Sequence, residues 1–180
     1  MEIEIALLGS VPPEFVLLSK DIVEGYLGLK AQVVGFLNMY SSEERVLAYE
    51  LLRRVREPLP GNMLLVITSK DIYHPGYNFL FGLALPGKRK AVVSFYRLLC
   101  GIRQIELERL AKEIVHELGH LMGLNHCETP GCVMRFSNSV FEVDEKDWRF
   151  CDRCLRDLEI RGFSVKRGYL LDITKYLNKR

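Results

Sequence analysis

The chain has 180 residues, 48% of them hydrophobic and 27% charged, with a formal net charge of +2 at pH 7. This length suffices to bury the core of one compact domain, and the small net charge gives no indication of a nucleic-acid partner. No uncharged apolar stretch approaches the roughly eighteen residues needed to cross a bilayer. We therefore expect a monomeric single-domain protein with neither a nucleic-acid nor a membrane partner.

Strands and helices alternate in the first seventy residues. Short apolar runs predict three strands, at residues 3–8, 31–37 and 63–68. Between the first two, a Pro-Pro pair opens a predicted helix that ends near Gly28. Between the next two, Ser41 and Glu44 form a capping box for a helix that Pro58 terminates. This order predicts an α/β fold (α+β in some schemes) with a mostly parallel twisted sheet and flanking helices.

Two further strands are predicted before the longest helix. Residues 78–85 are interrupted by Gly82 and follow the third strand without a crossover helix, so we expect this strand antiparallel at the sheet edge. Residues 91–96 predict the fifth strand. Apolar side chains at helical spacing then predict an amphipathic helix over residues 102–122.

The predicted C-terminal part has one more helix, from a cap at Asp144 to about Ile160. Cys151 and Cys154 would share one face of it, three residues apart. Residues 163–171 could be extended, and their role is not readable from the sequence.

The run His-Glu-Leu-Gly-His-Leu-Met-Gly-Leu-Asn-His, residues 116–126, predicts a catalytic zinc site. On a helix, His116 and His120 project from one face and can share a metal ion, with Glu117 beside them as general base. Gly123 can adopt positive φ and turn the chain back, so that His126 returns as a third ligand. Three imidazoles leave the fourth tetrahedral position open for water, as catalytic zinc requires. The alternative is that these histidines belong to a core helix, where they form ordinary hydrogen bonds and bind no metal.

Four of the cysteines, but not the remaining histidine, are candidate ligands of a second metal ion. His74 stands in a Tyr-His-Pro-Gly turn and is expected at the surface or in a loop rather than on a metal. Two short-spaced cysteine pairs are typical of a closed thiolate zinc site that supports folding; they are Cys127 with Cys132 and Cys151 with Cys154.

Two other interpretations of the cysteines remain open. Cys151 and Cys154 could be a redox pair, although the strand that precedes thioredoxin-like sites is missing. The second interpretation is disulfide bonds. The acidic start Met1-Glu2-Ile3-Glu4 does not resemble a secretory signal, however, so we expect a reduced, cytoplasmic compartment. Cys100, in an apolar run, is expected to be buried.

The histidine run resembles the extended zinc signature of the metzincins, which continues to a methionine turn. Met134, eight residues after His126, is the candidate for that turn, although spacing alone favours a core residue and only the resemblance indicates the turn. A cysteine directly after His126, Cys132 two residues before Met134 and a distant CxxC narrow the resemblance to the archaemetzincins. This resemblance covers residues 113 to 154.

The resemblance implies a metzincin-like catalytic domain over residues 1–180 with two zinc ions. Residues 1–123 would form the sheet-and-helix half that ends in the active-site helix, and residues 124–180 a small zinc-stapled C-terminal half. His116, His120 and His126 would bind the catalytic zinc, with Glu117 as general base and acid. The second, structural zinc would be held by the four clustered cysteines, Cys127, Cys132, Cys151 and Cys154.

We therefore expect a zinc-dependent metallopeptidase that acts on a peptide or small protein. In metzincins the substrate lies along the sheet edge, here residues 78–85, where it could add as a further strand. A second hypothesis is a zinc-stabilised peptide-binding module whose hydrolytic activity is gated or absent. A third, a zinc ribbon for nucleic acid, is disfavoured by the weak charge and by the lack of interleaved aromatic and basic residues near Cys151.

Overall fold

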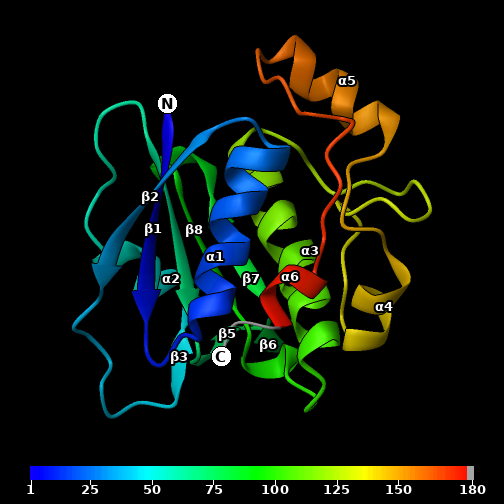
Figure 1. Ribbon diagram of the computed structural model, residues 1–180. Helices are drawn as coiled ribbons and strands as arrows, with labels where there is room; N and C mark the ends of the chain where they lie inside the picture. Colours follow the sequence, from blue (N-terminus) through cyan, green and yellow to red (C-terminus); the bar gives the residue numbers. More distant parts are fainter. Residues whose placement is uncertain (178–180) are drawn as a thin grey trace.

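The computed structural model describes residues 1–177 and has a central β-sheet with helices on both faces (Figure 1). The sheet contains five strands in the order β2-β1-β4-β8-β7. Their bounds are β1 Glu2–Leu8, β2 Lys30–Phe36, β4 Met63–Thr68, β7 Gly82–Leu85 and β8 Lys90–Ser94. All neighbouring pairs are parallel except β7 with β8. The predicted α/β fold with an antiparallel edge strand is confirmed.

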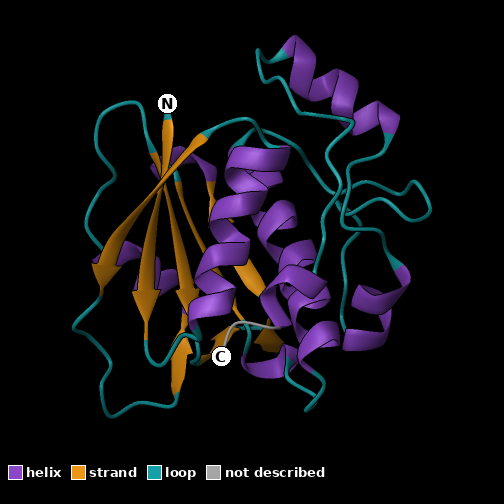
Figure 2. Cartoon of the chain, in the orientation of Figure 1, coloured by secondary structure: helices purple, strands orange, loops and turns teal. Residues whose placement is uncertain are grey.

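The sheet is the middle of three layers, as Figure 2 shows. Helix α1 (Pro13–Asp21), its π-helical continuation η1 (Ile22–Tyr26) and helix α3 (Arg103–Leu121) cover one face. Helix α2 (Ala48–Arg54) covers the other face. The alternation of β1 explains both layers, because Ile3 and Ile5 pack toward α1 and α3 while Ala6 and Leu8 pack toward α2.

A second, smaller sheet lies beyond the first, in the order β3-β5-β6. Its strands are β3 Arg45–Leu47, β5 Asp71–His74 and β6 Tyr77–Leu80. The helix predicted to start at the Ser41 capping box is wrong, because residues 45–47 pair in parallel with β5 and the helix begins only at Ala48. The single strand predicted over residues 78–85 is also wrong: Phe81 separates β6 from β7, and these belong to different sheets.

Short helical turns connect the remaining elements. The 3₁₀ turns are η2 (Pro86–Lys88), between β7 and β8, and η3 (Tyr96–Leu98), before α3. Helix α3 ends at Leu121 and is followed by Gly123 with a φ of 98°, as the sequence predicted for a sharp turn.

The single helix predicted from Asp144 to Ile160 is wrong. The structure has two helices, α4 (Val140–Glu145) and α5 (Asp152–Ile160). Ser139 caps α4. Asp144 lies inside α4 and caps no helix, since its carboxylate accepts two hydrogen bonds from Arg109 on α3. The chain between the helices has no regular structure and hydrogen-bonds to the loop before α4, through Val133 N–H and Arg149 C=O.

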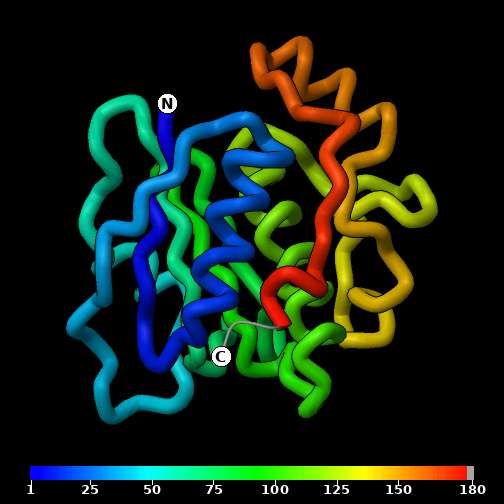
Figure 3. The backbone as a smooth tube through the Cα atoms, in the orientation of Figure 1, coloured from blue at the N-terminus to red at the C-terminus, as the bar shows by residue number. Residues whose placement is uncertain are grey.

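The last described residues return to the N-terminal half, as the tube in Figure 3 shows. Residues 163–171 form no strand, although they had the composition for one. Lys166 N–H bonds to the Tyr26 carbonyl and the Tyr169 ring lies against Gly25, where any Cβ would collide with it. Helix α6 (Thr174–Leu177) then packs beside α1 and α3. One continuous hydrophobic core therefore includes residues from both predicted halves.

Candidate active site and metal centres

Helix α3 and the turn behind it bring three imidazoles together. His116 and His120 are one helical turn apart, and their Nε2 atoms lie 3.1 Å from each other. After the turn at Gly123, His126 comes back so that its ring centroid is 5.4 Å from His116 and 4.8 Å from His120. One ring nitrogen from each of the three residues lies within 4.8 Å of the other two. This convergence is what the histidine spacing predicted.

Backbone carbonyls orient two of these rings. His116 Nδ1 lies 2.8 Å from the Val133 carbonyl oxygen, and His120 Nδ1 lies 2.8 Å from that of Leu124. Since a carbonyl only accepts hydrogen bonds, each Nδ1 carries the proton and each Nε2 presents a lone pair. Two nitrogens bound tetrahedrally to one zinc ion are about 3.3 Å apart, for Zn–N bonds of roughly 2.0 Å. The observed 3.1 Å therefore fits a shared zinc ion.

Loss of hydration favours the neutral form of all three rings, most for His116 and least for the more exposed His126. It lowers the pKa of His116 well below its usual value, and the charge of Lys146 acts in the same direction. Burial likewise lowers the pKa of His120 and His126. A neutral imidazole is the form that binds metal, so protons do not compete for these nitrogens near neutral pH.

Glu117 lies beside the histidines with its side chain buried against the edge strand. Gly82 of β7 makes room for it, since a Cβ at Gly82 would lie only 2.4 Å from Glu117 Oε1. Burial raises the pKa of Glu117 well above its usual range, and the charge of Glu113 one turn earlier raises it further. A carboxyl group with a raised pKa can take up a proton and give it back near neutral pH.

The histidines and Glu117 open into a cleft of about 790 Å³. Strands β6 and β7 line the cleft, and the chain after Met134 adds Phe136 and Ser137 to its lining. The Phe136 ring centroid lies 5.2 Å from that of His126. An edge strand along a cleft of this kind can pair with an extended peptide.

The cleft also contains residues that the sequence interpretation missed. Glu113 could have been found, because it precedes Glu117 by four residues and so shares its helix face. Lys146, Gly82 and Phe136 had no such signal, since they come from distant segments. His74, expected at the surface or in a loop, instead ends β5, is half-buried and lines the cleft; as expected, it is not part of the histidine cluster.

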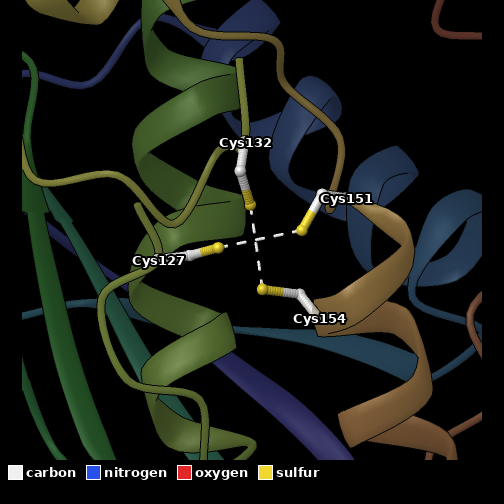
Figure 4. Close-up of side chains that lie close together, drawn as sticks. All are labelled: Cys127, Cys132, Cys151 and Cys154. Atoms are coloured by element: carbon white, nitrogen blue, oxygen red, sulfur yellow. Dashed lines mark hydrogen bonds between the residues drawn. The ribbon is translucent and has the colours of Figure 1, made fainter. Parts of the chain in front are cut away.

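The four clustered cysteines converge at a second centre, shown in Figure 4. Cys127 Sγ lies 3.8 Å from Cys151 Sγ, and Cys132 Sγ lies 3.7 Å from Cys154 Sγ. All five cysteines of the chain are free thiols. Four sulfurs bound tetrahedrally at roughly 2.3 Å from one zinc ion are about 3.8 Å apart, so the donor set fits zinc. With all four positions filled by protein, such a site has no place for substrate.

The thiols differ in how easily they ionise. Burial raises the pKa of Cys132 to about 11 and raises that of Cys154 further. Burial acts in the same direction on Cys151, but hydrogen bonds from its neighbours, the Cys154 N–H first among them, lower its pKa to about 7. Cys100 is exposed, so its predicted burial is wrong: the turn before α3 points it to solvent.

Met134 lies fully buried beneath the histidine-bearing helix. Its sulfur packs against Gly119, where a Cβ would approach to 2.5 Å, and Gly119 sits between His116 and His120 on α3. The Met134 carbonyl accepts a hydrogen bond from the Cys127 N–H, and its own N–H points to Cys132 Sγ at 3.4 Å. Met134 therefore contacts the histidine-bearing helix through its side chain and the cysteine cluster through its backbone.

Within residues 1–177, no helix combines the length and apolarity that a membrane span requires.

Comparisons with known proteins agree with this geometry. The model of a family described as Peptidase family M54 matches residues 16–160. A curated archaemetzincin of Pyrococcus horikoshii is 47% identical over 115 residues, an alignment that covers 61% of each chain. The archaemetzincin of Pyrococcus abyssi is 36% identical over 174 residues, which is 84% of this chain and 91% of the relative.

The solved structures include a close match in fold. The crystal structure of the archaemetzincin of Archaeoglobus fulgidus superimposes with a TM-score of 0.78 at 35% sequence identity. The superposition covers 87% of this chain and 99% of the other.

Proposed function

This chain belongs to peptidase family M54, the archaemetzincins, and from that premise we propose that it is a zinc-dependent hydrolase of peptide bonds. The observation that carries the proposal is the convergence of three neutral imidazoles beside a buried carboxyl group in an open cleft. These are the ligand set and the proton carrier that zinc hydrolysis needs.

His116, His120 and His126 would hold the catalytic zinc ion. When bound, zinc supplies a Lewis acid and lowers the pKa of its water to roughly 7. Glu117 would take the proton of the attacking water and return it to the leaving amine. The carbonyls of Val133 and Leu124 would hold the His116 and His120 rings in the tautomer that presents Nε2.

Cys127, Cys132, Cys151 and Cys154 would hold a second zinc ion with a structural role, giving two per chain. Support comes from the sulfur separations and from the short, irregular segments that these cysteines join. In a protein with few regular elements between residues 122 and 152, a metal clip supplies order that burial does not.

The substrate would be a peptide or small protein laid along β7, with its scissile bond beside Glu117. Support comes from the position of Gly82, which belongs both to the edge strand and to the Glu117 contact. We further propose that residues 1–180 act as one monomeric catalytic domain, because a single core joins its two halves. Free thiols at the second centre support a reducing, cytoplasmic environment as part of this proposal.

A digest of an unbiased peptide library tests the proposal. Zinc-loaded protein should create new amino termini, and Glu117→Gln should bind the same metal yet create none. The proposal fails if the zinc-loaded wild type cleaves nothing, or if Glu117→Gln cleaves as fast as wild type after removal of contaminating proteases.

A peptide-binding module without turnover is the second candidate. The observation that favours it is the deep burial of Glu117, which raises its pKa and so favours the protonated form that cannot act as a base. This function predicts saturable peptide binding to the zinc-loaded wild type with no new amino termini.

A further inference from the structure

A lysine without a role in the proposed chemistry lies in the wall of the catalytic cleft. Lys146 follows α4 in extended conformation (φ −88°, ψ 154°), and its side chain reaches the cleft beneath the loop that contains Arg135. Only 3% of this side chain is exposed. Lysine is rarely buried to this degree unless its charge is compensated.

The compensating charge belongs to Glu113 on α3. Lys146 Nζ lies 3.0 Å from Glu113 Oε1, and the Glu113 side chain is 4% exposed. An ion pair so deeply buried is weak support for a fold, because apolar residues of similar volume often replace such pairs with no loss of stability. The fold alone therefore does not explain why a cation is placed in this cleft.

Both members of the pair have unused hydrogen-bonding capacity. The ammonium group has three donors, and the hydrogen bond that it makes with the described chain goes to the Arg135 carbonyl, at 3.3 Å. Its contact with Glu113 is not directed as a hydrogen bond, and Glu113 Oε1 has no hydrogen-bond partner within residues 1–177. Buried polar groups that lack partners in a cleft indicate a ligand that completes them.

The position of Lys146 indicates which part of a ligand it would meet. Glu113 precedes Glu117 by one helical turn on the same face of α3, so the pair adjoins the proton carrier. Lys146 lines the same cleft as His116, His120 and His126, and its charge acts on all three rings. A fixed cation at this place faces the site where hydrolysis generates negative charge.

We propose that Lys146 is a further catalytic residue, which donates an N–H to the carbonyl oxygen of the scissile bond, and that Glu113 is the positioning residue that holds it. This inference rests on the proposed peptide hydrolysis. When water adds to the carbonyl carbon, the C=O π pair moves to the oxygen and one water proton goes to Glu117. Lys146 only donates a hydrogen bond. The oxyanion pair then re-forms the C=O bond, the C–N bond breaks with its electron pair going to nitrogen, and Glu117 returns the proton to that nitrogen.

The first test is the steady-state kinetics of Lys146→Met. Loss of one donor to the developing oxyanion should lower kcat by about 10²-fold with little change in KM, as for other oxyanion donors. Lys112→Met is the matched control. Lys112 also reaches toward the end of α4, through the carbonyls of Val143 and Asp144, but it does not line the cleft, and its removal should leave kcat within about threefold of wild type.

A double variant separates catalysis from folding. Lys146→Met alone leaves the Glu113 charge buried without a partner and should lower the melting temperature. Glu113→Gln combined with Lys146→Met removes both charges and should recover stability. If Lys146 acts on the reaction, kcat stays low in the double variant although its stability is recovered. Recovery of kcat together with stability would show that the pair is only structural.

A binding measurement completes the test without turnover. A phosphinic pseudopeptide with apolar side chains carries the negative charge of the tetrahedral state, and calorimetry should show its Kd rise at least tenfold in the double variant. A plain peptide bound to Glu117→Gln should be held equally well with and without Lys146, because a ground-state carbonyl carries little charge.

The two proposals fail in distinguishable ways. If the zinc-loaded wild type hydrolyses nothing, the proposed function fails, and the role of Lys146 fails with it. If the wild type hydrolyses peptides but the double variant keeps kcat and phosphinic affinity within about threefold, only the role of Lys146 is overturned.

Discussion

The histidine cluster and the cysteine cluster meet at one peptide bond, between His126 and Cys127, yet they differ in how open they are to solvent. The histidine cluster lines a cleft, and its third member, His126, is exposed. The cysteine cluster has three buried members and a full set of four donors. An open position suits a metal that must meet substrate, whereas a closed set suits a metal that holds the chain together.

The two clusters also depend on different supports. The rigid helix α3 positions His116 and His120, with carbonyls fixing their ring tautomers. The cysteines instead join loops and the start of α5, which have little regular structure of their own. We therefore expect removal of the cysteine-bound metal to disturb the fold and removal of the histidine-bound metal to disturb only the chemistry.

Cys154→Ser should have the largest effect. The loss of one buried thiolate should release the structural metal and lower the melting temperature by about 10 °C or more, since structural zinc contributes directly to folding. Because Cys127 follows His126, zinc should also bind more weakly to the histidine cluster. Cys100→Ser, which changes an exposed thiol outside the cluster, is the control and should leave zinc content and melting temperature unchanged. If Cys154→Ser has the melting temperature of the wild type, the cysteine cluster does not support the fold, and the proposed difference between the clusters is wrong.

His126→Ala should abolish hydrolysis while the fold persists. Metal analysis should find about one zinc ion per chain in place of two, and the melting temperature should fall by only a few degrees. His74→Ala, which removes the histidine outside the cluster, should keep both ions. Retention of two ions by His126→Ala would mean that His126 is not a ligand.

Gly82→Ala should affect the chemistry alone. The added methyl group would lie 2.4 Å from Glu117 Oε1, so Glu117 must move, and displacements of about 1 Å can lower rates by about 10²-fold. Turnover should therefore fall by about 10- to 100-fold with both metals bound. Gly87→Ala, at a nearby position with open space for a Cβ, should retain normal turnover. Equal turnover of Gly82→Ala and Gly87→Ala would show that the position of Glu117 does not affect the reaction.

The number of protons that zinc displaces on binding should differ between the two clusters, and calorimetry can measure this smaller effect. The histidines have a lowered pKa and are already neutral at pH 7.5, so zinc should displace fewer than about 0.5 protons there. Thiols with a raised pKa are protonated at pH 7.5, so zinc should displace roughly two or more from the cysteines. Titration in buffers of different ionisation enthalpy measures both values, with metal-free His126→Ala reporting the cysteine cluster. Equal proton numbers would contradict the assigned protonation states.

The sequence predicted the histidine cluster well because its geometry is local. Helical spacing places His116 beside His120, and Gly123 supplies the positive φ that brings His126 back. The parallel sheet followed similarly from alternating strands and helices. The Lys146–Glu113 pair was not predictable, because it depends on how α4 packs against α3.

Local signals misled the interpretation where tertiary contacts prevailed. The capping box at Ser41 is intact in sequence, but pairing of β3 with β5 delays the helix to Ala48. Asp144 is a good capping residue by type, but Arg109 engages its carboxylate, and α4 ends at Glu145, before an extended Lys146, where the helix was predicted to continue. In both cases a long-range partner outweighed a propensity that contributes about 1 kcal/mol.

Zinc-edge anomalous diffraction from crystals grown with excess zinc at neutral pH tests the central claim most directly. Two peaks are predicted. One should be held by His116, His120 and His126, with its remaining position open to the cleft, and the other should be enclosed by the four cysteine sulfurs. A first peak closed by a fourth protein ligand, or three imidazoles that share no metal in a fully loaded crystal, would contradict the account.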